Sequence, residues 1–300
     1  MFWNESARDT VYRELCQEGA RILSGIMEEE REAQLDARLL LEYVCGTNLQ
    51  TLLLDAERVV SREEVERYRE LLVRRSRREP LAYIVGSSDF MGLTFEVDNR
   101  VLIPRQDTEV LVAAALDLAA MLDGAPALLD LCTGSGCILL SLLHYSNGST
   151  GVGTDLSSDA LEVAKKNAVR LGLEDRCEWR QGDLFEAVRE GEKFDLIVSN
   201  PPYIRSEVIG GLAPEVKTHE PMMALDGGED GLSFYRRIIP QAYRYLVTGG
   251  MLYLEIGYDQ AQEVTALMEE AGYYEVRTIR DYGGNDRIVC GIKSIHQSER

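Results

Sequence analysis

Strand-like and helix-like segments alternate along the chain from residue 127, and this alternation constrains the fold more than any other feature. Short apolar runs that end in turn residues predict buried strands, and the longer runs between them predict helices. The predicted strands span 127–132, 151–156, 177–182, 194–199, 251–256, 274–279 and 287–292, and the predicted helices 136–145, 158–171, 232–246 and 260–270. This order predicts a doubly wound, mostly parallel, Rossmann-like α/β sheet of seven strands. The last two strands flank Gly283-Gly284 as a hairpin, so one strand is expected to run antiparallel.

Two further parts are predicted upstream of this sheet. Residues 5–75 carry apolar residues at helical spacing, and Ser61 with Glu64 forms a capping box that begins a helix. Alternating apolar residues near Gly86 and Gly92 then predict a β-hairpin. We therefore expect a helical bundle over 1–77, a β-hairpin linker over 78–106 and the α/β domain over 107–300.

The predicted strand 194–199 is followed directly by the tetrapeptide Asn200-Pro201-Pro202-Tyr203. Two consecutive prolines exclude helix and hold the backbone extended. The tetrapeptide therefore lies at the carboxyl end of a strand, where open α/β sheets bind their ligands. The side-chain oxygen of Asn200 and the carbonyl of Pro201 are two acceptors, and Tyr203 offers a flat ring. This combination fits a planar NH2 group.

Composition narrows the class of protein. The formal net charge of the 300 residues is −19, which argues against a nucleic-acid backbone as the main partner. No basic and apolar leader and no long apolar segment is present, so we expect a cytoplasmic protein that does not enter a membrane. The six cysteines form no Cys-x-x-Cys and the three histidines are scattered, so we expect free thiols and no metal site.

A glycine-containing loop and three acidic residues follow the first three predicted strands. Gly134 and Gly136 lie in the loop Cys132-Thr133-Gly134-Ser135-Gly136, but the third glycine of a dinucleotide fingerprint is missing. Asp155, followed by Leu156, is placed to bind both hydroxyls of a ribose. Asp183 is placed to accept from an adenine amine with Leu184 against the ring, and Asp130 to orient the loop or reach an ammonium group. The set fits an adenosine with an amino-acid tail and no phosphates, which is S-adenosylmethionine.

These motifs together resemble class I methyltransferases, and more specifically the release-factor glutamine methyltransferases of the PrmC or HemK family. The resemblance covers residues 78–292. It rests on the loop 130–136, Asp155, Asp183 and Asn200-Pro-Pro-Tyr203, and on the further matching segments 78–86, 102–105, 108–109, 220–225, 227–231, 254–257 and 281–287. Gln106 and Asp107 depart from the family's usual Pro-Glu.

The resemblance implies a role for most of these residues. It implies that residues 132–136, Asp155 and Leu184 bind S-adenosylmethionine, which leaves as S-adenosylhomocysteine. Asn200 and the residues after it would bind a glutamine side chain, within the Gly-Gly-Gln loop of a peptide-chain release factor. Arg105, Thr108 and Glu109 would lie beside the mouth of the site. We expect a monomer whose helical bundle recognises the release factor.

Three other functions share part of this pattern. An N6-adenine methyltransferase of DNA or RNA presents the same planar amine to the same tetrapeptide, although the acidic charge disfavours it. A ribosomal-protein glutamine methyltransferase shares most of the motifs. A non-catalytic protein that binds S-adenosylmethionine would not need an intact Asn200-Pro-Pro-Tyr203.

Overall fold

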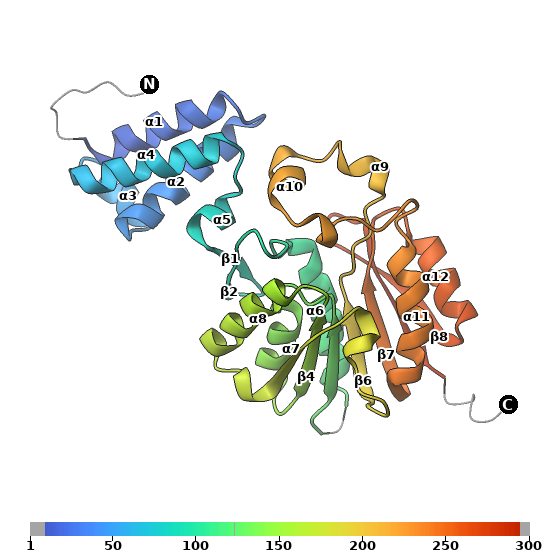
Figure 1. The fold of residues 1–300 in the computed structure, drawn as a ribbon. Helices are drawn as coiled ribbons and strands as arrows, with labels where there is room; N and C mark the ends of the chain where they lie inside the picture. The colour runs from blue at the N-terminus through green and yellow to red at the C-terminus, as the bar shows by residue number, and fades with distance from the viewer. Residues whose placement is uncertain (1–9, 123, 295–300) are drawn as a thin grey trace. The chain divides into compact units, whose positions relative to one another are not determined.

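A seven-stranded sheet in the order β5-β4-β3-β6-β7-β9-β8 forms the centre of the larger part of the chain (Figure 1). The computed structural model describes residues 10–122 and 124–294. Strands β3 to β7 pair in parallel, and β9 is antiparallel to both β7 and β8, so the predicted single antiparallel strand is confirmed. The strands are β3 (Ala127–Leu131), β4 (Thr150–Asp155), β5 (Cys177–Gln181), β6 (Phe194–Ser199), β7 (Leu246–Glu255), β8 (Tyr273–Arg280) and β9 (Asp286–Lys293).

Both faces of this sheet are covered by helices, because apolar residues run continuously along the central strands. Leu128, Val198 and Tyr253 pack in one buried cluster with residues of α6, α7 and α8, and Leu129, Ile197 and Leu252 pack in a second with residues of α11 and α12. The helices are α6 (Glu109–Ala119), α7 (Cys137–Tyr145), α8 (Ser158–Leu171), α11 (Ser233–Tyr245) and α12 (Ala261–Glu270). The predicted doubly wound α/β fold is therefore confirmed.

Short elements complete this unit. The predicted β-hairpin is formed by β1 (Ser87–Phe90) and β2 (Leu93–Glu96), which pair antiparallel. Between the strands and helices lie α9 (Ser206–Ile209) and the 3-10 turns η1 (Gln106–Thr108), η2 (Glu174–Arg176), η3 (Leu184–Ala187) and η4 (Met222–Ala224). Only the strand β7 differs much from its predicted range, since it begins at Leu246 rather than at 251.

The remaining described residues form a separate helical unit. It contains α1 (Tyr12–Ser24), α2 (Glu30–Cys45), α3 (Leu49–Leu54), α4 (Arg62–Ser76), α5 (Leu81–Val85) and the distant α10 (Pro214–His219). The predicted capping box is present at the start of α4, where Ser61 and Glu64 each bind the other's backbone N–H. Residues 1–9 of the predicted bundle and 295–300 of the predicted α/β domain lie outside the described residues.

Contacts place the boundary of the helical unit at Gly86, within the range 78–106 where the sequence predicts only a linker. The reason is α5, a helix that the sequence analysis missed. Ile84 is buried in the core of the helical unit, and Leu81 and Val85 pack against that core. Gly86 ends α5 in the left-handed conformation, with φ of 78°, which glycine adopts without strain.

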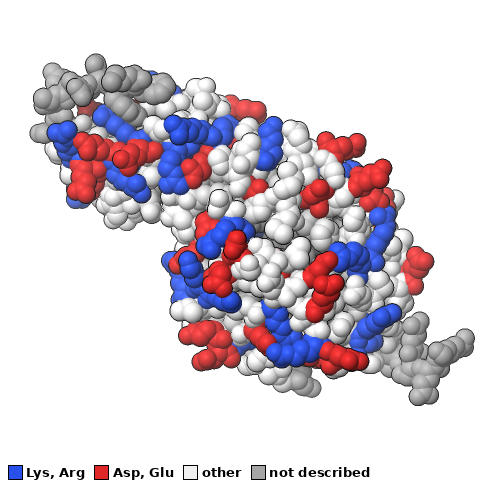
Figure 2. All heavy atoms as spheres, viewed as in Figure 1, with Lys and Arg blue, Asp and Glu red and all other residues white. Residues whose placement is uncertain are grey.

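No helix in the described part of the chain is both long enough and apolar enough to cross a membrane. The six cysteines, all of them described, are free thiols as predicted. Acidic and basic side chains are interspersed on the face of the molecule in Figure 2, although the chain as a whole is strongly acidic.

Candidate active site

Five parallel strands bring their carboxyl ends to one edge of the sheet, and this edge carries the predicted site residues. β4 and β5 lie to one side of β3, and β6 and β7 lie to the other, so the chain switches direction between β3 and β6. Ligands bind at such a switch point in open α/β sheets. The residues at or just beyond these strand ends are Cys132, Asp155, Asp183, Asn200 and Glu255.

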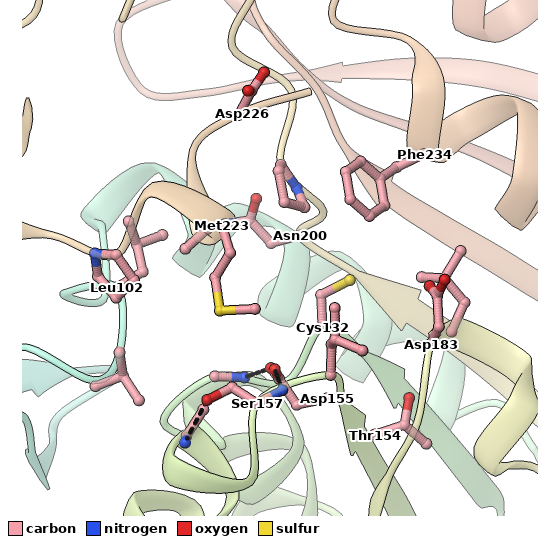
Figure 3. A pocket seen from close by; sticks show the side chains of 18 of the residues that line it. Leu102, Cys132, Thr154, Asp155, Ser157, Asp183, Asn200, Met223, Asp226 and Phe234 are labelled. Carbon is pink, nitrogen blue, oxygen red and sulfur yellow. Dashed lines mark hydrogen bonds between the residues drawn. The ribbon is translucent and has the colours of Figure 1, made fainter. Parts of the chain in front are cut away.

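A cavity of about 550 Å³ opens at this edge (Figure 3). Its volume is in the usual range for a small-molecule site. Eight of the residues that the sequence predicts for the site line it: Cys132, Gly134, Asp155, Leu156, Asp183, Leu184, Asn200 and Pro202. The structure therefore brings together residues that are separated by up to 70 positions in the sequence.

Asp155, the last residue of β4, holds the glycine-containing loop against the cavity. Its Oδ2 accepts the backbone N–H of Gly134 at 2.9 Å, and its Oδ1 accepts that of Ser157 at 2.9 Å (Figure 3). Burial raises the pKa of this carboxyl, and the hydrogen bonds that it accepts from the backbone oppose that shift. Each carboxylate oxygen has a further lone pair, so hydroxyl groups of a ligand can still donate to Asp155.

Two residues of the cavity wall adopt a left-handed backbone conformation although neither is glycine. Cys132 has φ of 58° and Leu184 has φ of 54°. Such conformations cost free energy in residues with a Cβ and are concentrated at functional sites. The two strained positions lie at the ends of β3 and β5, which are the loops predicted to contact the cofactor.

Asp183 lines the cavity, but its carboxylate is already partnered. Oδ2 of Asp183 pairs with the Arg237 guanidinium of α11 at 2.7 Å, and both side chains are partly exposed. The predicted hydrogen bond from an adenine amine therefore has to use the remaining acceptor sites of this carboxylate, and stays a prediction.

Other residues predicted to bind the cofactor lie behind the wall instead of in it. Asp130 is fully buried and accepts from the Thr133 hydroxyl at 2.6 Å. Burial raises the pKa of Asp130 to about 7. The Ser135 carbonyl accepts from Asn167 at 2.9 Å, and a Cβ at Gly136 would lie 2.8 Å from Trp179. These contacts fix the shape of the loop, and the predicted contacts of these residues with the cofactor stay predictions.

The tetrapeptide 200–203 is held rigidly at the end of β6. Asn200 lines the cavity, and its Nδ2 donates to the Thr108 hydroxyl oxygen at 3.2 Å. Pro201 and Pro202 are buried. The Tyr203 carbonyl accepts from Gln260 at 3.0 Å, and a Cβ at Gly227 would lie 2.7 Å from the Tyr203 Cα. Glycine is thus required where the segment 225–227 passes close to Tyr203 and pairs with the backbone of Ile204, the residue after the tetrapeptide.

Tyr203 has a different environment from Asn200. Its ring is not among the residues that line the cavity, and its hydroxyl donates to Oε1 of Glu255 at 3.2 Å. Burial raises the pKa of the Tyr203 hydroxyl above its usual range, so this group remains a donor at physiological pH. The predicted stacking of this ring on a substrate amide stays a prediction.

The three residues predicted at the mouth have separate surroundings, and none lines the cavity. Arg105 pairs with Oε1 of the buried Glu220. Thr108 is buried beneath Asn200. Glu109 accepts the backbone N–H of Met91 at 2.7 Å and so holds the turn between β1 and β2.

Sequence reasoning missed several residues of the site. Leu102, Met222, Met223 and Phe234 line the cavity together with the predicted residues. The segments of the first three carry a signal, because 102–105 and 220–225 are among the motifs that match the family, but an apolar side chain alone does not indicate a ligand. Phe234 lies in none of these motifs. Two buried carboxylates, Glu220 and Glu255, were also missed.

Comparisons with known proteins found relatives that match most of the chain. The family model for the PrmC N-terminal domain matches residues 14–86, and that for a methyltransferase domain matches 122–297. Two proteins named release factor glutamine methyltransferase are similar along most of their length. The protein of Caulobacter vibrioides is 44% identical to this chain, and the match covers 88% of this chain and 90% of that protein. The protein of Bradyrhizobium diazoefficiens is 45% identical, and the match covers 96% of this chain and 94% of that protein.

A solved methyltransferase structure from Pyrococcus furiosus superposes with a TM-score of 0.51 at 20% identity. The match covers 69% of this chain and 91% of that one, and at this identity it supports the fold alone.

We predict that Asp155→Ala weakens binding of S-adenosylmethionine by about 1.5–3 kcal/mol, which is roughly a 10- to 150-fold rise in Kd. The substitution removes acceptors for the ligand and also releases the N–H of Gly134. Calorimetry measures the Kd. The matched control is Asp195→Ala. Oδ2 of Asp195 also accepts a backbone N–H, that of Ala127, but at the amino ends of the strands, away from the cavity. An unchanged Kd for Asp155→Ala would refute its assignment to the ribose.

Proposed function

The chain belongs to the release factor glutamine methyltransferase family, and on that premise we propose that it methylates a glutamine side-chain amide in a peptide-chain release factor. The methyl group comes from S-adenosylmethionine, and the acceptor is the amide nitrogen of the glutamine in a Gly-Gly-Gln loop. The observation that carries the proposal is the position of Asn200, whose side chain lines the cavity beside Asp155 and Cys132.

The cavity fits S-adenosylmethionine by its donor and acceptor groups. Asp155 and Asp183 supply acceptors for the hydroxyl and amine groups of an adenosine, and Leu156 and Leu184 supply apolar surface. When bound, the cofactor supplies a methyl group on a positively charged sulfonium.

Asn200 provides the acceptor that a glutamine amide requires. An amide nitrogen is a poor nucleophile, because its lone pair is delocalised into the carbonyl group. Hydrogen bonds from its two hydrogens to Asn200 Oδ1 and to the Pro201 carbonyl would orient it and stabilise the positive charge that develops during transfer. Because Nδ2 of Asn200 donates to Thr108, its Oδ1 is the atom left for the substrate. The nitrogen can lose its proton after the transfer, so this account requires no general base.

The function is tested by offering the protein three acceptors with S-adenosylmethionine labelled in its methyl group. We expect label in an intact release factor and none in a release factor whose Gly-Gly-Gln glutamine is replaced by alanine. Ribosomal protein and single- and double-stranded DNA or RNA should remain unlabelled. Label in adenine would favour an N6-adenine methyltransferase, and label in ribosomal protein would favour a ribosomal-protein glutamine methyltransferase. If no acceptor gains label, the protein would be a non-catalytic protein that binds S-adenosylmethionine.

Asn200→Ala is expected to lower the rate of methyl transfer by about 10²–10³, which is typical for losing one preorganised contact to a reacting group. Binding of S-adenosylmethionine should largely survive, because the other residues of the wall remain. The same substitution at the exposed Asn147, in the loop before β4, is the matched control and should leave the rate unchanged. A variant at Asn200 that keeps more than about a third of the wild-type rate would contradict the proposed role.

We further propose that the helical unit recognises the release factor and takes no part in the chemistry. None of the described residues of this unit lines the cavity. It does present large apolar side chains to solvent on α3, where Leu53 is 71% and Leu54 is 81% exposed. Adjacent exposed leucines of this kind are typical of surfaces that bind a protein partner.

Leu53→Ser combined with Leu54→Ser is predicted to raise KM for the intact release factor while leaving the rate on a short Gly-Gly-Gln peptide unchanged. Both side chains are already exposed, so the substitution should not destabilise the fold. Met121→Ser, at a position 80% exposed in the other unit, is the matched control. Equal KM values for the double variant and the wild type would contradict recognition through α3.

A further inference from the structure

Gln260 is a buried polar residue that the mechanism above does not use. It lies directly before α12 and is 3% exposed. Its side-chain NH2 group donates to two backbone carbonyls, to that of Tyr203 at 3.0 Å and to that of Gly231 at 3.2 Å. Its Oε1 accepts the backbone N–H of Gly257 at 2.9 Å. One buried side chain therefore ties the end of the tetrapeptide to two segments that are distant in the sequence.

The backbone of Gln260 is itself held in place. Its N–H donates to the Gly257 carbonyl at 3.0 Å, and its carbonyl accepts the N–H of Val264, in the first turn of α12, at 3.1 Å. Val264 is fully buried in the core between the sheet and its helices. The side chain of Gln260 therefore reaches the tetrapeptide from a fixed point of the fold.

Gly231 leaves the space that these hydrogen bonds need. It has φ of 75°, and a Cβ there would lie 2.5 Å from the Tyr203 carbonyl oxygen and 2.6 Å from Nε2 of Gln260. Any side chain at this position would displace one of the two groups. The fold thus places a residue without a Cβ where Gln260 contacts the tetrapeptide.

The chain just beyond the tetrapeptide is anchored as well. The Ile204 N–H donates to the Leu225 carbonyl at 3.0 Å, and the Ile204 carbonyl accepts the N–H of Gly227 at 2.8 Å. These two bonds hold residue 204, and Gln260 holds the Tyr203 carbonyl. The tetrapeptide is therefore fixed at its end by a side chain and by a neighbouring backbone segment.

The two prolines connect this anchor to the groups that would meet the substrate. Proline fixes its own φ near −65°, so Pro201 and Pro202 form a stiff link between β6 and Tyr203. A shift of the Tyr203 carbonyl therefore also shifts the Pro201 carbonyl and Asn200. A misplacement of about 1 Å at a reacting group can cost about 10²-fold in rate.

We propose that Gln260 is a positioning residue for methyl transfer: by holding the Tyr203 carbonyl, it keeps Asn200 and the Pro201 carbonyl where both can accept from one glutamine amide. This inference rests on the proposed function for its substrate, but the anchoring of the tetrapeptide is a property of the protein alone. Gln260 does not line the cavity, and it touches neither substrate nor cofactor in this account.

Two variants test the proposal on a short Gly-Gly-Gln peptide. Gln260→Glu keeps the shape of the side chain, but a carboxyl group has at most one hydrogen to donate where the amide donates two. Gly231→Ala reaches the same bonds from the other side, because the added Cβ would overlap the Tyr203 oxygen and Nε2 of Gln260. We expect kcat to fall about 10- to 100-fold in each variant. The Kd for S-adenosylmethionine should not change, because neither residue lines the cavity.

Each variant has a matched control in the same unit. Gln241→Glu is the control for the amide, since Nε2 of Gln241 also donates to a backbone carbonyl, that of Arg237, but at a solvent-exposed position of α11. Gly249→Ala is the control for the left-handed backbone, since Gly249 has φ of 81° and a Cβ there would meet no atom within 4 Å. Both controls should keep the wild-type kcat.

A comparison of kcat with cofactor binding separates positioning from a merely structural role. A structural role would weaken the binding of S-adenosylmethionine together with kcat, whereas positioning lowers kcat in a protein that binds the cofactor normally. Thermal melting shows whether each variant is folded. A folded variant at either position that keeps more than about a tenth of the wild-type kcat would overturn the proposal. A rise in Kd as large as the fall in kcat would overturn it too.

Failure of the proposed function would be visible separately. A wild-type protein that labels no release factor refutes the function but not the anchoring. The anchoring is then read from the amide signal of Tyr203, which protein labelled with 13C-carbonyl proline and 15N-tyrosine isolates, because Pro-Tyr occurs once in the sequence. We expect Gln260→Glu and Gly231→Ala to shift this signal and the two controls to leave it in place. An unmoved signal in the first two variants would overturn the inference whatever the activity.

Discussion

The carboxyl ends of five parallel strands meet along one edge of the sheet, and every feature of the candidate site depends on this constraint. The five strands β3, β4, β5, β6 and β7 all run parallel. Each strand therefore ends on the same side of the sheet, where it is followed by a loop or carries a functional side chain. The apolar faces of these strands are buried under helices on both sides, so the edge cannot shift in register without exposing the core. The sheet therefore holds the residues that line the cavity in fixed positions.

Much of this arrangement was predictable from the sequence. Short apolar runs that end in glycine, aspartate or proline define the strands, and the order of strands and helices then fixes which residues share an edge. Asp155 and Asn200 were assigned to the site for this reason, and both line the cavity. Helix α5 was missed because it is only five residues long and ends at a glycine that also suits a turn.

The partners of individual side chains were not predictable in the same way. Glu109 and Arg105 belong to a motif that matches the family, yet the first holds the β1–β2 turn and the second pairs with Glu220. Both partners are distant in sequence or lie in another loop, and only the folded chain brings them close. Glu255 lies in the segment 254–257 that matches the family, but it received no role, because a glutamate at the end of an apolar run has no local pattern that distinguishes a buried carboxylate from an exposed one.

The central claim is that the oxygen of Asn200 faces the amide nitrogen of a glutamine in the cavity. A crystal structure with S-adenosylhomocysteine and a peptide that contains N5-methylglutamine tests it most directly, because the methyl group identifies the nitrogen. We predict that this nitrogen lies about 2.9 Å from Asn200 Oδ1 or the Pro201 carbonyl, with its methyl group directed toward the sulfur. A methylated nitrogen that contacts neither oxygen, in a cavity otherwise occupied as described, would contradict the account.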